Sequence, residues 1–196
     1  MTNRKVTANI SLTLDGRYSG PKGPFDMGAI IPYAITDVAR NHLGRIWETA
    51  TMAVLGRVNA EGFLGYWPTV ANDETADPRD RAYAKWLTET QKVVFSSTLT
   101  TPPQERTRLV NAPAAEVIGA LRASGSGDIL INSSASIIRP LLAADMIDRL
   151  YLMICPEIAG GGQRIFEDGL PTSQWALTHF EAGTQGEIAL VYDRRR

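Results

Sequence analysis

The chain has 196 residues, of which 44% are hydrophobic, and its formal net charge is −1. This length and composition predict one globular domain, residues 1–196, with a single sizeable core. A charge near zero gives no electrostatic reason to expect nucleic acid or an anionic membrane as a partner. The sequence has no apolar run long enough to span a membrane and its N-terminus alternates in polarity, so we expect a cytoplasmic protein.

Metal and disulfide chemistry are not expected. The single cysteine, Cys155, lies in an apolar run and predicts a buried, inert thiol. Two histidines without a cysteine cluster do not predict a zinc site. We expect His42 to face solvent from its helix and His179 to have a structural role.

The first elements are a strand and a long loop. Apolar and polar residues alternate from Val6 to Leu14, which predicts a strand that ends in the turn Asp15-Gly16. Residues 17–27 are rich in glycine and proline. A loop of this length in a compact domain favours a functional role, and a plain surface loop stays equally open.

Helical and strand-like segments then alternate. Asp37 is expected to cap a helix that reaches Trp47, and residues 52–55 predict a buried strand. Residues 58–63 predict a short helical turn. Asp77-Pro78 predicts the start of another helix, and residues 92–96 predict a third strand.

Residues 127–166 predict the centre of the fold. They read as a strand, a polar turn, a helix, a second strand and a glycine-rich loop, which is a crossover that places two parallel strands in one sheet. Pro140 should kink the helix or delay its start. A helix capped by Asn111 is expected before this unit, and residues 175–181 and 187–193 predict a hairpin after it.

Three predicted strands end in turns of small residues: Gly56-Arg57, Ser96-Ser97-Thr98 and Asn132-Ser133-Ser134. Because parallel neighbours point the same way, these turns are expected on one rim, where a long phosphorylated ligand could lie across them. The glycine fingerprints of Rossmann and P-loop proteins are absent from the sequence, so those two interpretations are disfavoured.

An ordered set of segments carries a resemblance to a known family. The set consists of Asn9 to Gly16, Leu55 to Phe63 with Tyr66-Trp67-Pro68, Ser96 to Leu99, Ile147 to Pro156, and Gly160 to Phe166. Together they resemble the dihydrofolate-reductase-like family, and more closely the reductase domain of the riboflavin-biosynthesis deaminase-reductase. The resemblance implies a three-layer α/β fold with a mixed, mostly parallel sheet and a C-terminal antiparallel hairpin. It also implies NADPH as hydride donor and a homodimer.

The resemblance further implies a cofactor site. The diphosphate is expected near Gly56, Arg57, Asn59 and the turn that follows the central strand, and the 2′-phosphate near Ser96 to Thr98. The cofactor-binding residues are then Leu14, Gly16, Gly56, Arg57, Asn59, Ser96, Ser97, Thr98, Asn132, Ser133, Ser134, Ala135, Ser136 and Ile137.

Few residues are candidates for the chemistry itself. Asp15 follows the first strand beside the expected nicotinamide and is the first choice for proton delivery or substrate orientation, although an Asp-Gly pair is often only a turn. Glu61 and Trp67 are candidates for the substrate pocket, with Trp67 equally plausible as a core aromatic residue.

Two departures from the family pattern stand out. The family commonly has Ser-Arg where this chain has Ser96-Ser97, and an arginine there would grip the 2′-phosphate. The family also usually has glycine at the turn 132–134, where a missing side chain lets the diphosphate approach the backbone. The preference for NADPH over NADH is therefore open.

Two classes of function follow. The first is an NADPH-dependent reductase of a small pterin-like or pyrimidine-like heterocycle. The second is a non-catalytic, nucleotide-binding dimeric protein of the same fold. Ordinary dihydrofolate reductase is a weaker alternative, because Asp37 looks like a helix cap and not a pterin-binding acid. A homodimer is expected because the apolar run 150–154 and the terminal hairpin exceed what one small sheet face needs.

Overall fold

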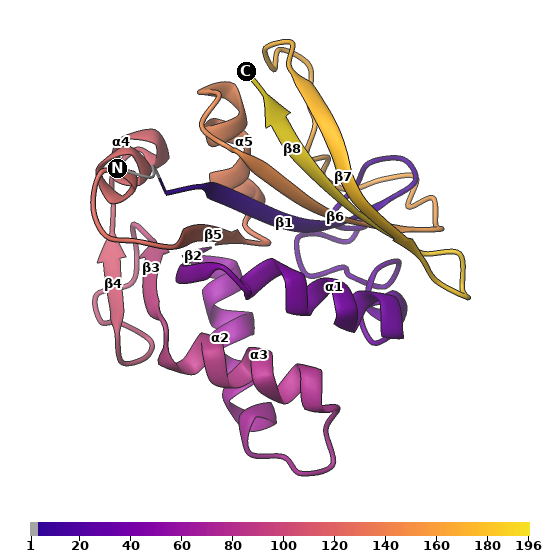
Figure 1. The fold of residues 1–196 in the computed structure, drawn as a ribbon, viewed down its shortest axis with the longest axis horizontal. Coiled ribbons are helices and arrows are strands. Elements are labelled where there is room, and N and C mark those ends of the chain that lie inside the picture. The colour runs from indigo at the N-terminus through magenta and orange to yellow at the C-terminus, as the bar shows by residue number, and fades with distance from the viewer. Residues whose placement is uncertain (1–3) are drawn as a thin grey trace.

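The computed structural model describes residues 4–196 as a three-layer α/β fold (Figure 1). Residues 1–3 of the predicted domain lie outside the described part. The strands are β1 Val6–Thr13, β2 Ala50–Gly56, β3 Gln91–Phe95, β4 Thr107–Val110, β5 Asp128–Asn132, β6 Arg149–Cys155, β7 Gln174–Ala182 and β8 Ile188–Arg195. The helices are α1 Asp37–Trp47, α2 Arg57–Ala71, α3 Pro78–Glu89, α4 Ala114–Arg122 and α5 Ala135–Ala143, with a 3-10 turn η1 at Ile31–Tyr33.

All eight strands form one sheet in the order β4-β3-β2-β5-β1-β6-β8-β7. The six strands from β4 to β6 are parallel to their neighbours, whereas β8 pairs antiparallel with both β6 and β7. The predicted fold class, a mostly parallel sheet finished by an antiparallel hairpin, is confirmed. The predicted crossover from β5 through α5 to β6 is also present, with β1 lying between its two strands.

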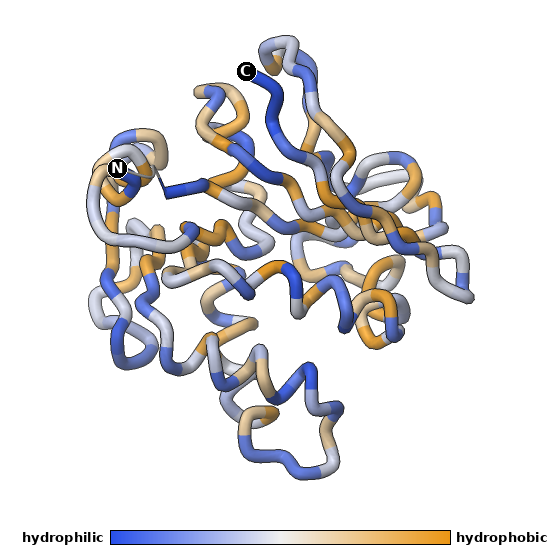
Figure 2. Tube along the Cα trace, viewed as in Figure 1, coloured by the Kyte–Doolittle hydropathy of each residue, from blue (hydrophilic) through white to orange (hydrophobic). Residues whose placement is uncertain are grey.

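Alternate residues of the central strands bury against helices on opposite faces of the sheet. On β2, Val54 belongs to the cluster under α4 and α5, while its neighbours Ala53 and Leu55 pack with α2 and α3. Period-two alternation of this kind is what a strand needs when both faces are covered. Figure 2 shows hydrophobic residues along the central strands and hydrophilic ones at the C-terminal end and in the loop between α2 and α3.

Strand β6 is covered on both faces within one copy of the chain. Leu150 and Leu152 belong to the cluster under α5, and Tyr151 and Met153 face α1. All four are at most 7% exposed. The apolar run 150–154 is therefore no reason to expect a second subunit, because the monomer buries its first four residues and half-buries Ile154.

Helix α2 is much longer than the predicted turn at 58–63. Gly62, Gly65 and Pro68 are poor helix formers, which is why the sequence predicts an early end. Proline has no N–H to give the carbonyl four residues earlier, and here the side chain of Gln104 donates to the Leu64 carbonyl instead, at 2.8 Å. Tertiary contacts thus replace the missing helical hydrogen bond.

Other boundaries differ at the caps. Thr36, not Asp37, caps α1, and Pro113, not Asn111, precedes α4. Helix α5 begins at Ala135 and continues through Pro140, so its start is not delayed. Within residues 4–196, no helix is long and apolar enough to cross a membrane.

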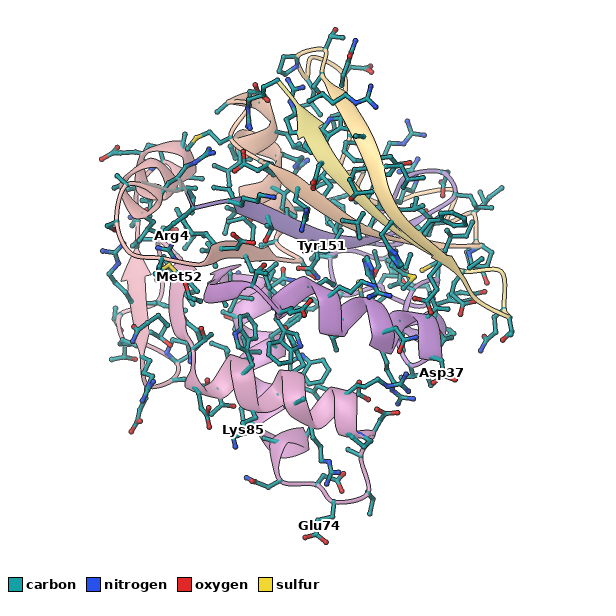
Figure 3. All side chains as sticks on the ribbon, viewed as in Figure 1. Arg4, Asp37, Met52, Glu74, Lys85 and Tyr151 are labelled. Atoms are coloured by element: carbon teal, nitrogen blue, oxygen red, sulfur yellow. The ribbon has the colours of Figure 1, made fainter. Side chains whose placement is uncertain are left out.

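His42 corrects another expectation, because it is only 3% exposed. It lies on the packed stripe of α1 with Val38 and Ile46, one turn away on either side. Its ring packs edge-on against Tyr151, with 5.8 Å between the ring centroids, and Figure 3 shows Tyr151 beside α1. Neither ring nitrogen has a hydrogen-bond partner among the described residues, and burial lowers the pKa of His42 to about 4.

Candidate functional site

A cleft of about 320 Å³ opens at the carboxyl edge of the parallel sheet. It is bounded by the end of β1, the starts of α2 and α5, and the segment before α1. The residues that line it include Ser11 of β1, Asn59 and Phe63 of α2, and Ser133 and Ser136 beside α5. Parallel α/β sheets bind ligands at this edge, so the cleft is the candidate site.

The starts of α2 and α5 meet at this cleft, and neither has a side-chain cap. The backbone N–H of Gly56 donates to the Ser134 hydroxyl at 2.9 Å, which ties the two starts together. A Cβ at Gly56 would lie 3.1 Å from the Ser136 hydroxyl oxygen, so any side chain here would crowd the rim. Two adjacent, uncapped helix starts direct backbone N–H groups and positive dipole ends at one place.

The turn after β5 is held from both sides. Ser133 has a φ of 51°, a left-handed conformation that glycine adopts freely and that costs serine about 1 kcal/mol. Asn9 compensates with a hydrogen bond from its amide to the Ser133 hydroxyl, at 3.1 Å, and Asn59 donates to the Ser133 carbonyl at 2.9 Å. The chain therefore makes this left-handed turn with serine in place of glycine, supported by two asparagine side chains.

Asn132, the last residue of β5, is buried below this turn. Its amide nitrogen donates to the hydroxyl of Tyr83, which is completely buried, and its Oδ1 has no partner among the described residues. Asn132 therefore supports the turn from the side of α3 and does not line the cleft.

Within the turn after β3, a side chain of the turn accepts hydrogen bonds from two of its backbone N–H groups. The Ser96 hydroxyl accepts from the backbone N–H groups of Thr98, at 3.1 Å, and Leu99, at 2.9 Å. Ser97 and Thr98 are exposed. Because β3 is the parallel neighbour of β2, this turn lies on the same rim as Gly56.

Asp15 is committed to a loop contact. Its carboxylate accepts from the Thr13 hydroxyl at 2.6 Å, from the backbone N–H groups of Ala159 and Gly160, and from Arg17 at 2.8 Å. The hydrogen bond from Thr13, followed by those from the backbone and from Arg17, holds the pKa of Asp15 well below its usual range. The carboxylate is ionised and fully used, and it does not line the cleft.

Other predicted residues also lie away from the cleft. Glu61 is exposed and pairs with Arg57 at 2.7 Å, one turn earlier on α2. Trp67 packs edge-on against Tyr83, with 4.6 Å between ring centroids, in the cluster beneath α2 and α3. The side chain of Leu14 is 62% exposed, and Gly16 forms the turn after β1. Of the predicted set, the cleft is lined by Asn59, Ser133, Ala135 and Ser136.

The segment 17–36 supplies a wall that the sequence did not assign residue by residue. Tyr18, Met27, Ile30 and Ile31 line the cleft. The segment is docked on the loop 159–164, where Gly162, with a φ of 99°, approaches the Ser19 carbonyl so closely that no Cβ fits. The expected functional loop therefore borders the candidate site.

Tyr18 and Gln163 are the two lining residues that the prediction missed most clearly. The Tyr18 hydroxyl donates to Oε1 of Gln163 across the two loops, and partial burial raises the pKa of Tyr18. A tyrosine two residues after a strand-ending Asp-Gly turn was a usable signal. Gln163 gave none, because only the docking of the loops brings it to the cleft.

These layers, this cleft edge and the C-terminal hairpin define a dihydrofolate-reductase-like protein. A model of the RibD C-terminal domain matches residues 4–189, and the chain belongs to that family. The predicted resemblance is thereby confirmed. Family membership supports a reductase-type role. No curated protein matches the chain in sequence.

Solved structures agree on the fold. A protein described as a riboflavin biosynthesis protein from Shewanella sp. PV-4 has a TM-score of 0.68 at 20% identity, over 98% of this chain and 99% of the other. The bifunctional deaminase/reductase of Thermotoga maritima has 0.64 at 14% identity, over 98% of this chain and 57% of that longer one. Dihydrofolate reductase from Enterococcus faecalis, solved with NADP(H), has 0.59 at 16% identity, over 98% and 97%. At these identities the likeness establishes the fold alone.

Proposed function

We propose that this protein is an NADPH-dependent oxidoreductase that reduces a small pterin-like or pyrimidine-like heterocycle. The observation that carries the proposal is the meeting of two uncapped helix starts, α2 and α5, beside a cleft at the carboxyl edge of the sheet. Membership in the RibD C-terminal domain family supports a reductase.

The rim fits the diphosphate of a dinucleotide. Backbone N–H groups at the starts of α2 and α5 would bind its oxygens, with Asn59 and the Ser136 hydroxyl beside them. The missing side chain at Gly56 leaves room for close approach. When bound, NADPH supplies the hydride, and the chain's own residues position the two reactants.

The adenosine 2′-phosphate would lie at the turn after β3. Ser97 and Thr98 offer hydroxyl and backbone donors but no positive charge. A charge-assisted hydrogen bond contributes roughly 1.5–3 kcal/mol, so its absence should limit the preference for NADPH over NADH to about tenfold to a hundredfold.

Tyr18, and not Asp15, is the proton donor in the proposed reaction. Asp15 serves to fix the loop 159–160 against β1, because its carboxylate is ionised and saturated with donors. Tyr18 lines the cleft and stays protonated at neutral pH, since burial raises its pKa. Its phenol can give a proton to the atom next to the carbon that receives the hydride, and water then restores the phenol.

The test is spectroscopic. Loss of NADPH absorbance that depends on an added heterocycle, over a panel of pterins and pyrimidines, supports the reductase. Titration of NADPH and NADH by calorimetry measures cofactor binding independently of turnover. If neither cofactor binds, the assignment of the rim is overturned.

A non-catalytic nucleotide-binding protein is the second candidate. It is favoured by the absence of any carboxylate among the described residues that line the cleft. Tight NADPH binding without absorbance loss over the whole panel would select this alternative.

We also propose a homodimer that pairs through the hairpin of β7 and β8. On this hairpin Leu177 is 48% exposed and Phe180 is 65% exposed. Exposed apolar side chains that gather in one patch often mark an interaction surface. Light scattering should give twice 21.4 kDa, and Phe180→Lys should shift the mass toward the monomer. A wild-type mass of 21.4 kDa at micromolar concentration contradicts the proposal.

A further inference from the structure

We infer that the acceptor bound in this cleft is uncharged and carries neither a phosphate nor a carboxylate group; this inference rests on the proposed reductase function and narrows its substrate class. The cleft is lined by fifteen described residues, and none of them is charged. Nine are apolar and six carry hydroxyl or amide groups.

The two sides of the cleft differ in polarity, because the helix starts supply more hydroxyl and amide groups than the segment 17–36 does. The hydroxyl and amide groups of Asn59, Ser133 and Ser136 lie at the starts of α2 and α5, where the proposed diphosphate binds. Apolar side chains, among them Met27, Ile30 and Ile31, come from the segment before α1. The acceptor must lie against this apolar wall, because the cofactor occupies the polar rim.

Three arginines near the cleft have carboxylate partners, whereas Arg164, next to Gln163, is exposed and has no ion pair among the described residues. The pairs are Arg17 with Asp15 at 2.8 Å, Arg57 with Glu61 at 2.7 Å, and Arg139 with Glu167 at 2.5 Å. A buried anion without a cationic or hydrogen-bonding partner is strongly unfavourable. To hold a phosphate on the acceptor, the site would have to break one of these pairs or recruit Lys22 or Arg164, whose exposed side chains do not line the cleft.

Neutral hydrogen bonds are available instead. The Tyr18 hydroxyl is bonded to Oε1 of Gln163, and the amide nitrogen of Gln163 donates to no other described residue. An amide N–H and a phenol next to an apolar wall suit the carbonyl and ring nitrogen of an uncharged heterocycle.

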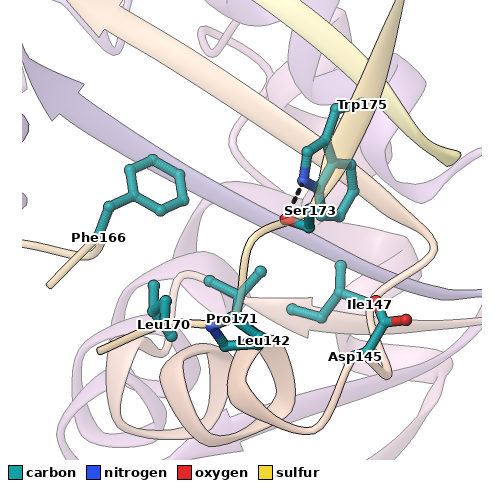
Figure 4. Close-up of a pocket in the computed structure, with 8 residues that line it drawn as sticks. All are labelled: Leu142, Asp145, Ile147, Phe166, Leu170, Pro171, Ser173 and Trp175. Atoms are coloured by element: carbon teal, nitrogen blue, oxygen red, sulfur yellow. Dashed lines mark hydrogen bonds between the residues drawn. The ribbon is translucent and has the colours of Figure 1, made fainter. Parts of the chain in front are cut away.

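A second apolar hollow lies elsewhere and differs in charge (Figure 4). It measures about 230 Å³ between Phe166, Trp175 and the end of α5, with Asp145 at its edge. Arg194 lies over the Trp175 ring and pairs with Asp145. The affinity of a ligand bound there would depend on these charges and would not change with a substitution at the cleft.

The experiment uses two fluorescent diarylamines that differ by one sulfonate. N-phenyl-1-naphthylamine is neutral, and 1-anilinonaphthalene-8-sulfonate is its anionic counterpart. Both are titrated into the full chain, into Ile31→Arg and into Ile35→Arg, each with excess NADP⁺, because the open helix starts at the rim would otherwise attract the sulfonate. The two isoleucines are matched, at 61% and 63% exposed, but Ile31 lines the cleft and Ile35 does not.

The neutral probe should bind the unchanged protein at least about tenfold more tightly than the anion, which is about 1.4 kcal/mol. Ile31→Arg should raise the affinity of the anion several-fold, and Ile35→Arg should leave both constants unchanged. Equal or tighter binding of the anion to the unchanged protein would overturn the inference. So would constants that Ile31→Arg does not move relative to Ile35→Arg. Because these are equilibrium measurements, failure of the reductase assay leaves them interpretable.

Discussion

Two pairs of helices in this molecule begin in different ways. Helix α1 starts under the Thr36 hydroxyl, which accepts from the Ala39 N–H at 3.2 Å, and α3 starts under the Asp77 carboxylate, which accepts from the Arg79 N–H at 2.9 Å. Helices α2, α4 and α5 start without such caps, and of these α2 and α5 lie at the cleft. The side-chain caps of α1 and α3 serve stability, whereas at the cleft the uncapped starts of α2 and α5 leave backbone donors for a ligand.

The same two regions treat buried polar groups differently. Beside the cleft, the Ser134 hydroxyl is buried but both accepts from Gly56 and donates to the Asn132 carbonyl. Beneath α1, His42 is buried with both nitrogens unpaired. The paired Ser134 hydroxyl thus joins the two helix starts beside open backbone donors, whereas burial of the unpaired His42 carries an electrostatic cost that depends on pH.

The largest effect on cofactor binding is expected at Gly56. Gly56→Val should weaken NADPH binding by at least about a hundredfold, about 2.7 kcal/mol, because the new side chain occupies the space between the starts of α2 and α5. Calorimetric titration measures the effect.

Gly65→Val is the matched control. It lies on α2, the helix that Gly56 precedes, and a Cβ there meets nothing within 4 Å. Its NADPH dissociation constant should stay that of the parent. If Gly56→Val binds as tightly as Gly65→Val, the diphosphate lies elsewhere.

The packed region should reveal itself by its dependence on pH. The pKa of His42 is about 4 in the folded protein and about 6.5 when unfolded, because burial disfavours the charged ring. The unfolded state therefore binds the proton first as pH falls below 6.5. Stability from this group is present above that pH and is lost toward pH 4, with about 2 kcal/mol lost by pH 5.

His42→Leu should remove that part of the acid sensitivity, as measured by urea unfolding at pH 7 and pH 5. The charged and titratable groups that act on His42 are Arg45, His179 and Glu181, so His179→Gln is the matched control. His179→Gln should retain the loss at pH 5. A wild-type protein equally stable at both pH values would show that His42 is hydrated or paired in solution.

The sequence predicted the layers better than their details. Periodicity located β1, β6 and the hairpin to within two residues at each end, because each strand has a clear apolar pattern. Strand β4, Thr107–Val110, was missed, since four residues at the edge of a sheet carry no alternation that a single sequence reveals. Local propensity also failed for the length of α2. Pro68 leaves the Leu64 carbonyl without its helical donor, and Gln104, 40 residues further along the chain, donates to it instead.

The candidate site was predicted in its backbone and not in its side chains. Gly56 and the turn 132–136 follow from strand ends and turn residues, which are local signals. Tyr18 and Gln163 meet only after two loops dock through Asp15 and Gly162, a tertiary event that no spacing encodes. His42 was misplaced for a simpler reason: it was assigned to the helix face opposite part of the apolar stripe, although it lies one turn from both Val38 and Ile46.

Ser97→Arg adds a positive charge to a rim that otherwise offers backbone and hydroxyl donors. NADPH affinity should rise about tenfold, about 1.4 kcal/mol, because the guanidinium can pair with the 2′-phosphate. NADH affinity should stay nearly unchanged, since it has no such group. Ser97 is exposed, so the gain should shrink as salt is added. Equal changes for both cofactors would place the 2′-phosphate away from this turn.

The smallest expected effects compare a helix start that has a side-chain cap with an uncapped start at the cleft. Thr36→Ala removes a helix cap and should cost about 1 kcal/mol of unfolding free energy while leaving NADPH binding unchanged. Ser136→Ala removes an exposed hydroxyl at the uncapped start of α5 and should do the reverse. Its NADPH affinity should fall several-fold, about 1 kcal/mol, with stability within about 0.5 kcal/mol of the parent. Urea unfolding and calorimetric titration of both variants give four numbers. The distinction between the two starts fails if Thr36→Ala weakens NADPH binding as much as Ser136→Ala does, because a capped start would then also contribute to the site.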